Sequence, residues 1–202
     1  LSHNRFKSVE SLANALSTNT TLTKLYLSGN KLERESIQCI AKMLKVNTML
    51  DLIELGDTSI DGDGMNYIVG ALKVNNTLTS IDLQENPIGD NAGMKHFTEM
   101  LKMNTTLIEI DLRDIELGEA VPSYIIEAFE VNSTLQFIYL GHHLDLYSAV
   151  DAIGLDNAIT IESLCERNRQ LEMPCIHRRI VDIVIAMSSH LPPYVILEIV
   201  DK

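Results

Sequence analysis

The stretch NTTLTKLYLSGNKL, at residues 19–32, has four close copies further along the chain. These are NTMLDLIELGDTSI at residues 47–60, NNTLTSIDLQENPI at residues 75–88, NTTLIEIDLRDIEL at residues 104–117 and NSTLQFIYLGHHLD at residues 132–145. Their first leucines are Leu22, Leu50, Leu78, Leu107 and Leu135, so the steps between copies are 28, 28, 29 and 28 residues. A constant step of this length indicates a repeat protein whose units stack in a row.

Each unit is predicted to hold one strand and one helix. The form L-x-x-[LI]-x-L alternates apolar and polar residues, which is the period of a half-buried strand. Apolar residues then recur at helical spacing, as in Ile37, Ile40, Ala41 and Leu44. Residues 1–16 fit a partial first unit. Stacking such units predicts an α/β solenoid, curved like a horseshoe, with a parallel sheet on its concave face and helices on its convex face.

Two sets of asparagines recur with the repeat. Asn30 and Asn86 follow the strand, where a buried amide can bond to turning backbone; Thr58 and His143 could partly substitute, and Ile115 could not, which predicts an altered turn in the fourth unit. A second set comes just past each helix, where we predict the left-handed conformation that ends helices. Its members are Asn19, Asn47, Asn75, Asn104 and Asn132. All but Asn47 begin N-x-[ST] sequons, which we interpret as part of the turn and not as glycosylation sites.

The N-x-T-L-x-x-L-x-L motifs and the 28-residue step resemble the ribonuclease-inhibitor class of leucine-rich repeats over about residues 1–145. That class includes ribonuclease inhibitor, the repeat domains of NOD-like receptors, Ran GTPase-activating protein and tropomodulin. The segment IAKMLKVNTML, at residues 40–50, is especially similar to the repeats of tropomodulin. The resemblance implies a domain that binds other proteins inside the cell.

The repeat period ends near Leu144, so we divide the chain into repeats at residues 1–144, an irregular terminal repeat at 145–172 and a helical C-terminal cap at 173–202. Asn168 resembles the start of a further unit, 36 residues after Asn132. A cap is expected because the end of a solenoid would otherwise expose its core. The alternative is a docking motif, since LPPYVILEIVDK loosely resembles the opening of an F-box.

Composition narrows the function classes. The net charge of −12 argues against nucleic acid and anionic membranes as partners, and favours a basic protein. No apolar run is long enough to cross a membrane. The three cysteines, few and far apart, favour a reducing compartment, so we expect a cytoplasmic protein. Because Leu1 opens in the middle of a repeat motif, we interpret the chain as a piece of a longer one.

Candidate catalytic and metal sites are weak. Asp57, Ser59, Asp61 and Asp63 approach a calcium loop, but Ile68 stands where the loop needs a glutamate. A zinc set of His142, His143, Cys165, Cys175 and His177 lacks the usual ligand spacings. No phosphate loop, nucleophile elbow or triad is present. We therefore expect no catalytic residue, no metal, no cofactor and no small-molecule substrate.

The polar positions of the strands face the concave side, where their placement is informative. Glu54, Asp82 and Asp111 fall at one strand position in three consecutive units, with Tyr26 and Tyr139 at the same position on either side. One interpretation is a solvated face that is acidic because the whole chain is acidic. The other is a docking strip for a basic protein, with aromatic anchors. The predicted strip consists of Tyr26, Glu54, Asp57, Asp82, Glu85, Asp111, Arg113, Asp114, Phe137 and Tyr139.

We thus predict a monomeric, non-enzymatic protein-interaction domain. The alternatives are an actin regulator similar to tropomodulin, a GTPase-activating protein of the Ran-activator type, and a sensor or effector repeat domain of a larger protein. Charge reversal of Glu54, Asp82 and Asp111 to lysine is expected to remove partner binding without unfolding the domain, because all three are expected to be exposed sheet positions.

Overall fold

The computed structural model describes residues 1–89, 91–141 and 154–170. Strands and helices alternate along it in the predicted order. The strands are β1 (Lys24–Tyr26), β2 (Leu52–Glu54), β3 (Ser80–Asp82), β4 (Glu109–Asp111) and β5 (Phe137–Tyr139). The helices are α1 (Glu10–Leu16), α2 (Arg34–Val46), α3 (Gly62–Leu72), α4 (Asn91–Leu101), α5 (Val121–Val131) and α7 (Leu155–Gln170).

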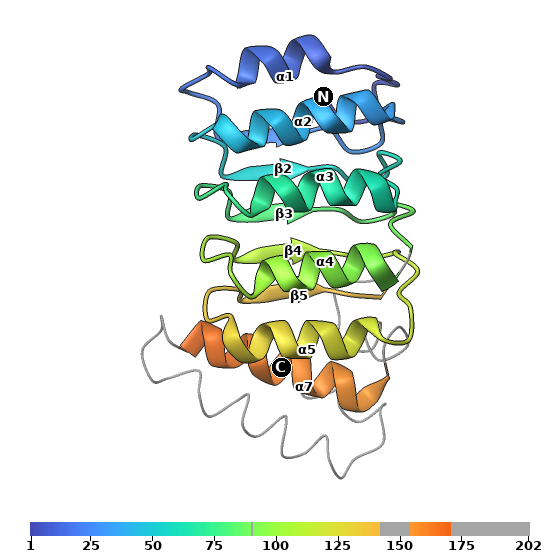
Figure 1. Cartoon of the computed structure of the whole chain (residues 1–202), viewed down its shortest axis with the longest axis vertical. Coiled ribbons are helices and arrows are strands. Elements are labelled where there is room, and N and C mark those ends of the chain that lie inside the picture. Colours follow the sequence, from blue (N-terminus) through green and yellow to red (C-terminus); the bar gives the residue numbers. More distant parts are fainter. Residues whose placement is uncertain (90, 142–153, 171–202) are drawn as a thin grey trace, which may run out of the picture.

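The strands pair in chain order, β1-β2-β3-β4-β5, and every pair is parallel. Figure 1 shows the helices stacked as one layer over one face of this sheet, with α1 at one end and α7 at the other. Each helix contacts the next one along the chain, from α1 to α5 and then α7. The predicted α/β solenoid is confirmed, and none of the described helices covers the other face of the sheet, here called the inner face.

The core lies between the two layers and is almost wholly aliphatic. The last leucine of each strand motif is buried in all five units, at Leu27, Leu55, Leu83, Leu112 and Leu140. The first leucine is fully buried in four units, but Leu22 is 38% exposed because no strand precedes β1. Burying a leucine side chain stabilises a fold by about 1.5–3 kcal/mol, so each unit depends on its neighbours for most of its stability.

The asparagines after the helices form a buried ladder. In Asn47, Oδ1 accepts hydrogen bonds from the backbone N–H groups of Met49 and Leu50, at 2.9 and 2.7 Å. Its Nδ2 donates to the carbonyl of Leu16, in the preceding helix, at 2.7 Å. Asn75, Asn104 and Asn132 repeat both contacts, so each of these amides joins one unit to the unit before it. We call Asn47, Asn75, Asn104 and Asn132 the asparagine ladder.

This ladder corrects the predicted backbone conformation. The residue Asn47 has φ −72° and ψ 130°, and Asn132 has φ −76° and ψ 125°, so both are extended and not left-handed. The side-chain oxygen holds the following two N–H groups in an Asx-type turn, which requires an extended backbone at the asparagine. Asn75, Asn104 and Asn132 are also buried with Nδ2 already donating inward. A glycan on Nδ2 is incompatible with that packing.

The turns that follow the strands use the other set of asparagines. Asn86 accepts from the N–H groups of Thr58 and Ile60 in the preceding unit, at 3.1 and 2.9 Å. Two units earlier, Asn30 accepts in the same way from the N–H groups of Asn4 and Phe6. Thr58 substitutes in part, since its hydroxyl donates to the carbonyl of Leu55 at 2.6 Å.

The apolar side chain of Ile115 alters the turn that it faces. With no amide at residue 115, the N–H of Ile88 donates instead to the carbonyl of its own near neighbour Asn86, at 2.8 Å. The third unit therefore has an altered turn next to Ile115, and an altered turn in the fourth unit itself stays a prediction. The residue His143, the other predicted substitute, lies outside the described residues.

Helix α7 covers the end of the solenoid. Ala158, Ile161 and Cys165 are buried in the common core, and α7 contacts α5. Asn168 donates to the carbonyls of Asn132 and Leu135 at 3.0 and 2.7 Å, so it extends the asparagine ladder from within a helix. The helix falls inside the predicted irregular unit at 145–172, whereas the boundaries of that unit and the cap at 173–202 lie outside the described residues.

No helix in the described part of the chain is long and apolar enough to span a membrane.

Candidate functional site

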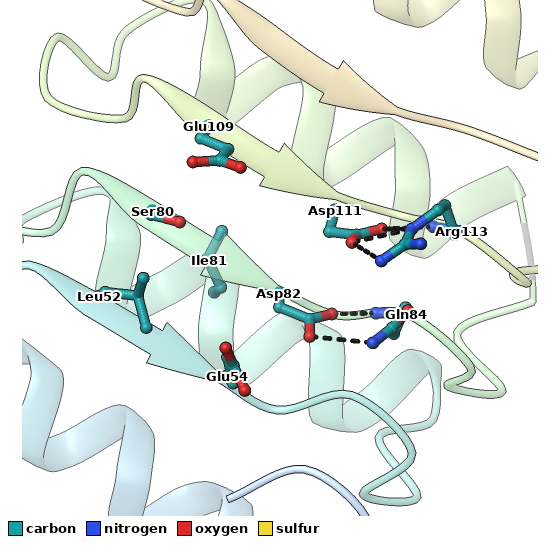
Figure 2. A pocket seen from close by; sticks show the side chains of 9 residues that line it. All are labelled: Leu52, Glu54, Ser80, Ile81, Asp82, Gln84, Glu109, Asp111 and Arg113. Carbon is teal, nitrogen blue, oxygen red and sulfur yellow. Dashed lines mark hydrogen bonds and ion pairs between the residues drawn. The ribbon is translucent and has the colours of Figure 1, made fainter. Parts of the chain in front are cut away.

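The inner face brings the predicted acidic column together. In the sheet register Tyr26 lies beside Glu54, Glu54 beside Asp82, Asp82 beside Asp111, and Asp111 beside Tyr139. Neighbouring strands of a sheet lie about 4.8 Å apart, so three carboxylates stand in one row. We call Glu54, Asp82 and Asp111 the carboxylate row (Figure 2).

One member of the row is already neutralised. Asp111 is only 9% exposed, and Arg113 donates to it from Nε at 2.9 Å to both oxygens and from Nη2 at 2.5 Å. The backbone N–H of Arg113 adds a fourth bond at 3.0 Å. The ion pair raises the pKa of Arg113. The expectation that Asp111 is an exposed sheet position is therefore wrong, because i and i+2 residues of a strand share a face and pair there.

The other two members keep uncompensated charge. Burial, together with Asp111 and Glu54, raises the pKa of Asp82 to about 6, against the opposing effects of the Gln84 N–H and of Arg113. Burial and Asp111 also raise the pKa of Glu54. The Asp82 carboxylate accepts from the backbone N–H of Gln84 at 2.8 Å and from its Nε2 at 3.2 Å. These neutral donors orient the carboxylate without removing its charge.

A glycine makes room for this carboxylate. A Cβ atom at Gly56 would lie 3.2 Å from Oδ2 of Asp82 and 2.8 Å from Cγ of Gln84. Gly56 follows β2, so the missing side chain lets the Asp82 carboxylate lie over the neighbouring unit. The position of the Asp82 carboxylate thus requires a glycine at residue 56, and the repeat pattern alone did not indicate this.

Three residues of the predicted strip belong to turns. Asp57, Glu85 and Asp114 follow the strand at one repeat position and have φ of 50°, 53° and 55°. His3 and Gly29 occupy the same position in earlier units with φ of 57° and 72°. The N–H groups at this position bond to the next unit, as from Asp57 to Gln84 at 2.9 Å. Asp57 is also paired with Lys31, so these residues edge the inner face and are not its centre.

The aromatic flanks differ at the two ends of the row. Tyr26 is 41% exposed beside Glu54. At the other end, Phe137 and Tyr139 stack with ring centroids 6.5 Å apart, and the Arg169 guanidinium of α7 lies 5.2 Å from the Phe137 ring. Burial and Glu109 raise the pKa of Tyr139. Phe137 is therefore partly covered by α7, and Tyr26 is the most exposed of the three aromatic side chains.

The row lies in a shallow depression of about 250 Å³. Its lining includes Glu109, which the predicted strip omitted (Figure 2). Glu109 occupies the strand position before the row, and it alone is acidic in a column that reads Lys24, Leu52, Ser80, Glu109 and Phe137. The strand register places Glu109 beside Phe137, two residues before Tyr139 on the same face, so the repeat alignment could have identified it.

The candidate metal residues are engaged elsewhere. Asp61 accepts from the N–H of Gly64 at 2.8 Å as the N-cap of α3, and Asp61 and Asp63 both pair with Arg34. Burial raises the pKa of the Cys165 thiol to about 12. His142, His143, Cys175 and His177 lie outside the described residues. Within the described ranges, no three His, Cys, Asp or Glu side chains are placed to hold a metal ion.

The repeats match a known family. Residues 18–41 and 74–95 match the family model described as Leucine Rich repeat. The fold of the chain is that of a leucine-rich-repeat solenoid. Each repeat unit is long and contains a full helix, which agrees with the ribonuclease-inhibitor class that the sequence resembles.

Two solved structures of similar fold cover most of the solenoid. One is leiomodin-1 actin-binding site 2, with 22% identity and a TM-score of 0.69 over 80% of this chain and 90% of that chain. The other is the tropomodulin C-terminal domain of Caenorhabditis elegans, with 14% identity and a TM-score of 0.68 over 80% of this chain and 93% of that chain. At these identities the likeness shows the fold. No curated protein matches the sequence significantly.

Proposed function

We propose that this leucine-rich-repeat solenoid is a non-enzymatic protein-interaction domain whose inner face binds a basic segment of a partner protein. The observation that carries the proposal is the carboxylate row, in which Glu54 and Asp82 are partly buried and form no ion pair with a cation in the part of the chain that the structure describes. We further propose that the protein works as a monomer in the cytoplasm, where the free thiols Cys39 and Cys165 would stay reduced.

The electrostatics of the row favour a cationic ligand. Like charges directly opposite on neighbouring strands destabilise a sheet. A lysine or arginine placed between Glu54 and Asp82 would relieve that repulsion, and it would also be steered toward a chain of net charge −12. A solvated acidic face would instead hold fully hydrated carboxylates with ordinary pKa values, which does not match the raised pKa of Asp82.

The flanking tyrosines give such a ligand apolar contacts. Tyr26 and Tyr139 stand at the two ends of the same row. Tyrosine and tryptophan supply much of the binding energy in protein interfaces, and cations bind favourably over aromatic rings. A basic segment crossing the strands would therefore meet an aromatic ring, the carboxylates and a second aromatic ring in turn.

A salt-dependent binding measurement tests the proposal. The probe is a lysine-rich peptide, titrated into the protein by calorimetry at low and high ionic strength. We expect the triple variant Glu54→Gln, Asp82→Asn and Glu109→Gln to lose at least tenfold in affinity and most of the salt dependence. Asp111 is left intact, because its replacement would leave the guanidinium of Arg113 unpaired.

A matched variant provides the control. Glu10→Gln, Glu116→Gln and Glu119→Gln remove the same net charge from exposed positions off the inner face. Equal loss of affinity in both triple variants would show that only net charge matters, and the inner-face site would then be rejected.

An actin-binding function is the second candidate. It is favoured by the leiomodin-1 structure, which is an actin-binding site and covers 80% of this chain at a TM-score of 0.69. An actin co-sedimentation and polymerisation assay tests it, with the inner-face triple variant as the comparison. A GTP-hydrolysis assay on a small GTPase separates the further alternative of a GTPase-activating protein.

A further inference from the structure

Four exposed apolar side chains occupy one position of the repeat. Val46, Val74, Met103 and Val131 are between 59% and 79% exposed, which is unusual for large apolar residues in a chain whose core is otherwise closed. Each comes immediately before an asparagine of the ladder. We call these four residues the apolar ridge.

The fold holds the ridge outward without using it. Because the amide of each following asparagine is fixed inside the stack, the backbone direction at the preceding residue is fixed as well. The core positions of each unit are filled by other residues, such as Met43 and Leu44 beside Val46. A polar side chain would satisfy the fold equally at the ridge position, as the exposed Thr18 does before Asn19. The apolar identity in four consecutive units therefore has no structural cause.

The ridge runs along one edge of the solenoid. All strands are parallel and alternate with the helices, so the helix-to-strand turns of successive units lie on the same side (Figure 1). Units are spaced by about 4.8 Å in a sheet and by about 8–10 Å between packed helix axes. The ridge residues lie at helix ends, as Val46 and Val131 do, or in the turn that leads to the next strand, so their spacing falls between these two limits. That range includes the roughly 6.6 Å between alternate residues of an extended chain.

Basic residues accompany the ridge. Lys45, Lys73 and Lys102 come immediately before the first three of its members. Lys45 and Lys73 are exposed, and Lys102 is held at the surface by Glu99 and Glu127 at 2.7 and 3.3 Å. The edge is thus apolar and basic at Lys45 and Lys73, whereas Lys102 is paired and the exposed Glu130 stands at the same position before Val131.

We propose that the apolar ridge with Lys45 and Lys73 is a second docking surface, which binds an extended, acidic segment of a partner protein through apolar side chains at alternate positions. The segment would place an apolar side chain against each unit and direct its carboxylates toward the lysines. This surface shares no residue with the carboxylate row, so the two proposals stand or fall separately.

Peptide selection tests the proposal directly. A random peptide library displayed on phage is selected on the full chain, and recovered peptides are measured by fluorescence polarisation. Three proteins are compared: wild type, a ridge variant with Val46→Ser, Val74→Ser and Met103→Ser, and the inner-face triple variant. We expect a class of acidic peptides with alternating apolar residues that binds the ridge variant at least about tenfold more weakly and the inner-face variant unchanged.

Two further variants separate packing from charge. Lys45→Glu with Lys73→Glu is expected to weaken the same peptides, whereas Lys45→Arg with Lys73→Arg keeps the charge and is expected to retain binding. Tyr67→Ser removes an exposed aromatic side chain from α3, together with its hydrogen bond from Gln38, and serves as the control away from the ridge. Thermal unfolding of each variant checks that the exposed substitutions leave the fold intact.

The proposal is overturned if no selected peptide binds the ridge variant more weakly than the wild type. It is also overturned if the peptides that do so are basic and not acidic. Sedimentation of the wild type is measured alongside. A dimer that dissociates in the ridge variant would assign the surface to a second copy of this chain, and would likewise overturn it.

Discussion

At the scale of the residue, one amide side chain per unit joins the units together. An asparagine amide both donates and accepts, so it can bond to two units at once. Asn75 uses both capacities, because Nδ2 donates to the carbonyl of Leu44 at 2.8 Å and Oδ1 accepts from Leu78 N–H at 2.8 Å. The backbone groups that it satisfies are buried, where an unmet hydrogen bond costs about 1–3 kcal/mol.

Asn75→Ala is therefore expected to lower the free energy of unfolding by about 2–4 kcal/mol, since buried backbone donors and an acceptor lose their partner. Urea denaturation measures the change. Asn19→Ala is the control. Asn19 is half-buried, and its Oδ1 accepts from the backbone N–H groups of Thr21 and Leu22 in exposed surroundings, where water can take the place of the lost oxygen. Equal losses in the two variants would contradict the account of the ladder.

Asp82 gives the solenoid a pH dependence of definite sign. Its folded-state pKa of about 6 lies above the ordinary 3.8, so the stability contributed by the bound proton is present below about pH 4 and is lost as the pH rises through 6. Asp82→Asn cannot ionise. We expect this variant to gain on the order of 1 kcal/mol relative to wild type between pH 4 and 7, after allowing for solvent screening of a partly exposed group. Urea denaturation of both proteins at each pH measures the difference in their free energies of unfolding. A difference that does not change with pH would contradict the prediction.

At the scale of the element, α7 closes the last unit through specific contacts. Arg167 donates from Nη2 to the carbonyls of Phe129 and Asn132, at 2.6 and 3.0 Å, where α5 ends and the last strand begins. Arg169, two residues further along α7, donates to the carboxylates of Glu162 and Glu166 and to the backbone carbonyl of Gln136. Between them these residues satisfy carbonyl groups that a further repeat would otherwise bond.

The thiol of Cys165 reports on this closure. Because its pKa is raised to about 12, only about one in ten thousand molecules carries the thiolate at pH 8, and the side chain is buried as well. In a Cys175→Ser background we expect a thiol reagent to label the half-buried Cys39 much faster than Cys165. Arg167→Ala should speed labelling of Cys165 alone. Acceleration at both thiols would indicate global unfolding and not opening of α7.

Most of the elements could be predicted from the sequence, and the reasons are local. The strand leucines and the helical stripe of α2 recur with the repeat, and the register of Glu54, Asp82 and Asp111 follows from the constant step. The pairing of Asp111 with Arg113 could not be predicted from the sequence, because Arg113 lies near both Asp82 and Asp111 and could form an ion pair with either. The backbone of Asn47 was predicted wrongly, since an asparagine after a helix serves either a left-handed cap or an Asx-type turn.

At the scale of the whole molecule, stability is shared between neighbours. Each unit buries its leucines against the units on either side, so a cavity in a central unit affects two interfaces. We expect Leu78→Ala to cost about 2–5 kcal/mol, whereas Leu22→Ala, at the partly exposed equivalent position, should cost less than about 1 kcal/mol. Thermal and urea unfolding of the two variants give the comparison. Similar losses would show that the first unit is packed as tightly as the third.

The asparagine ladder also has a mechanical consequence. Each of its amides joins its own unit to the unit before it, so tension applied to the two ends is carried in series from unit to unit. Stretched in an optical trap, the chain should lengthen in separate steps, each releasing one unit of 28 residues, or about 100 Å of extended polypeptide. A solenoid built in this way behaves as a spring with discrete links, whose partners could sense load through the number of units still closed.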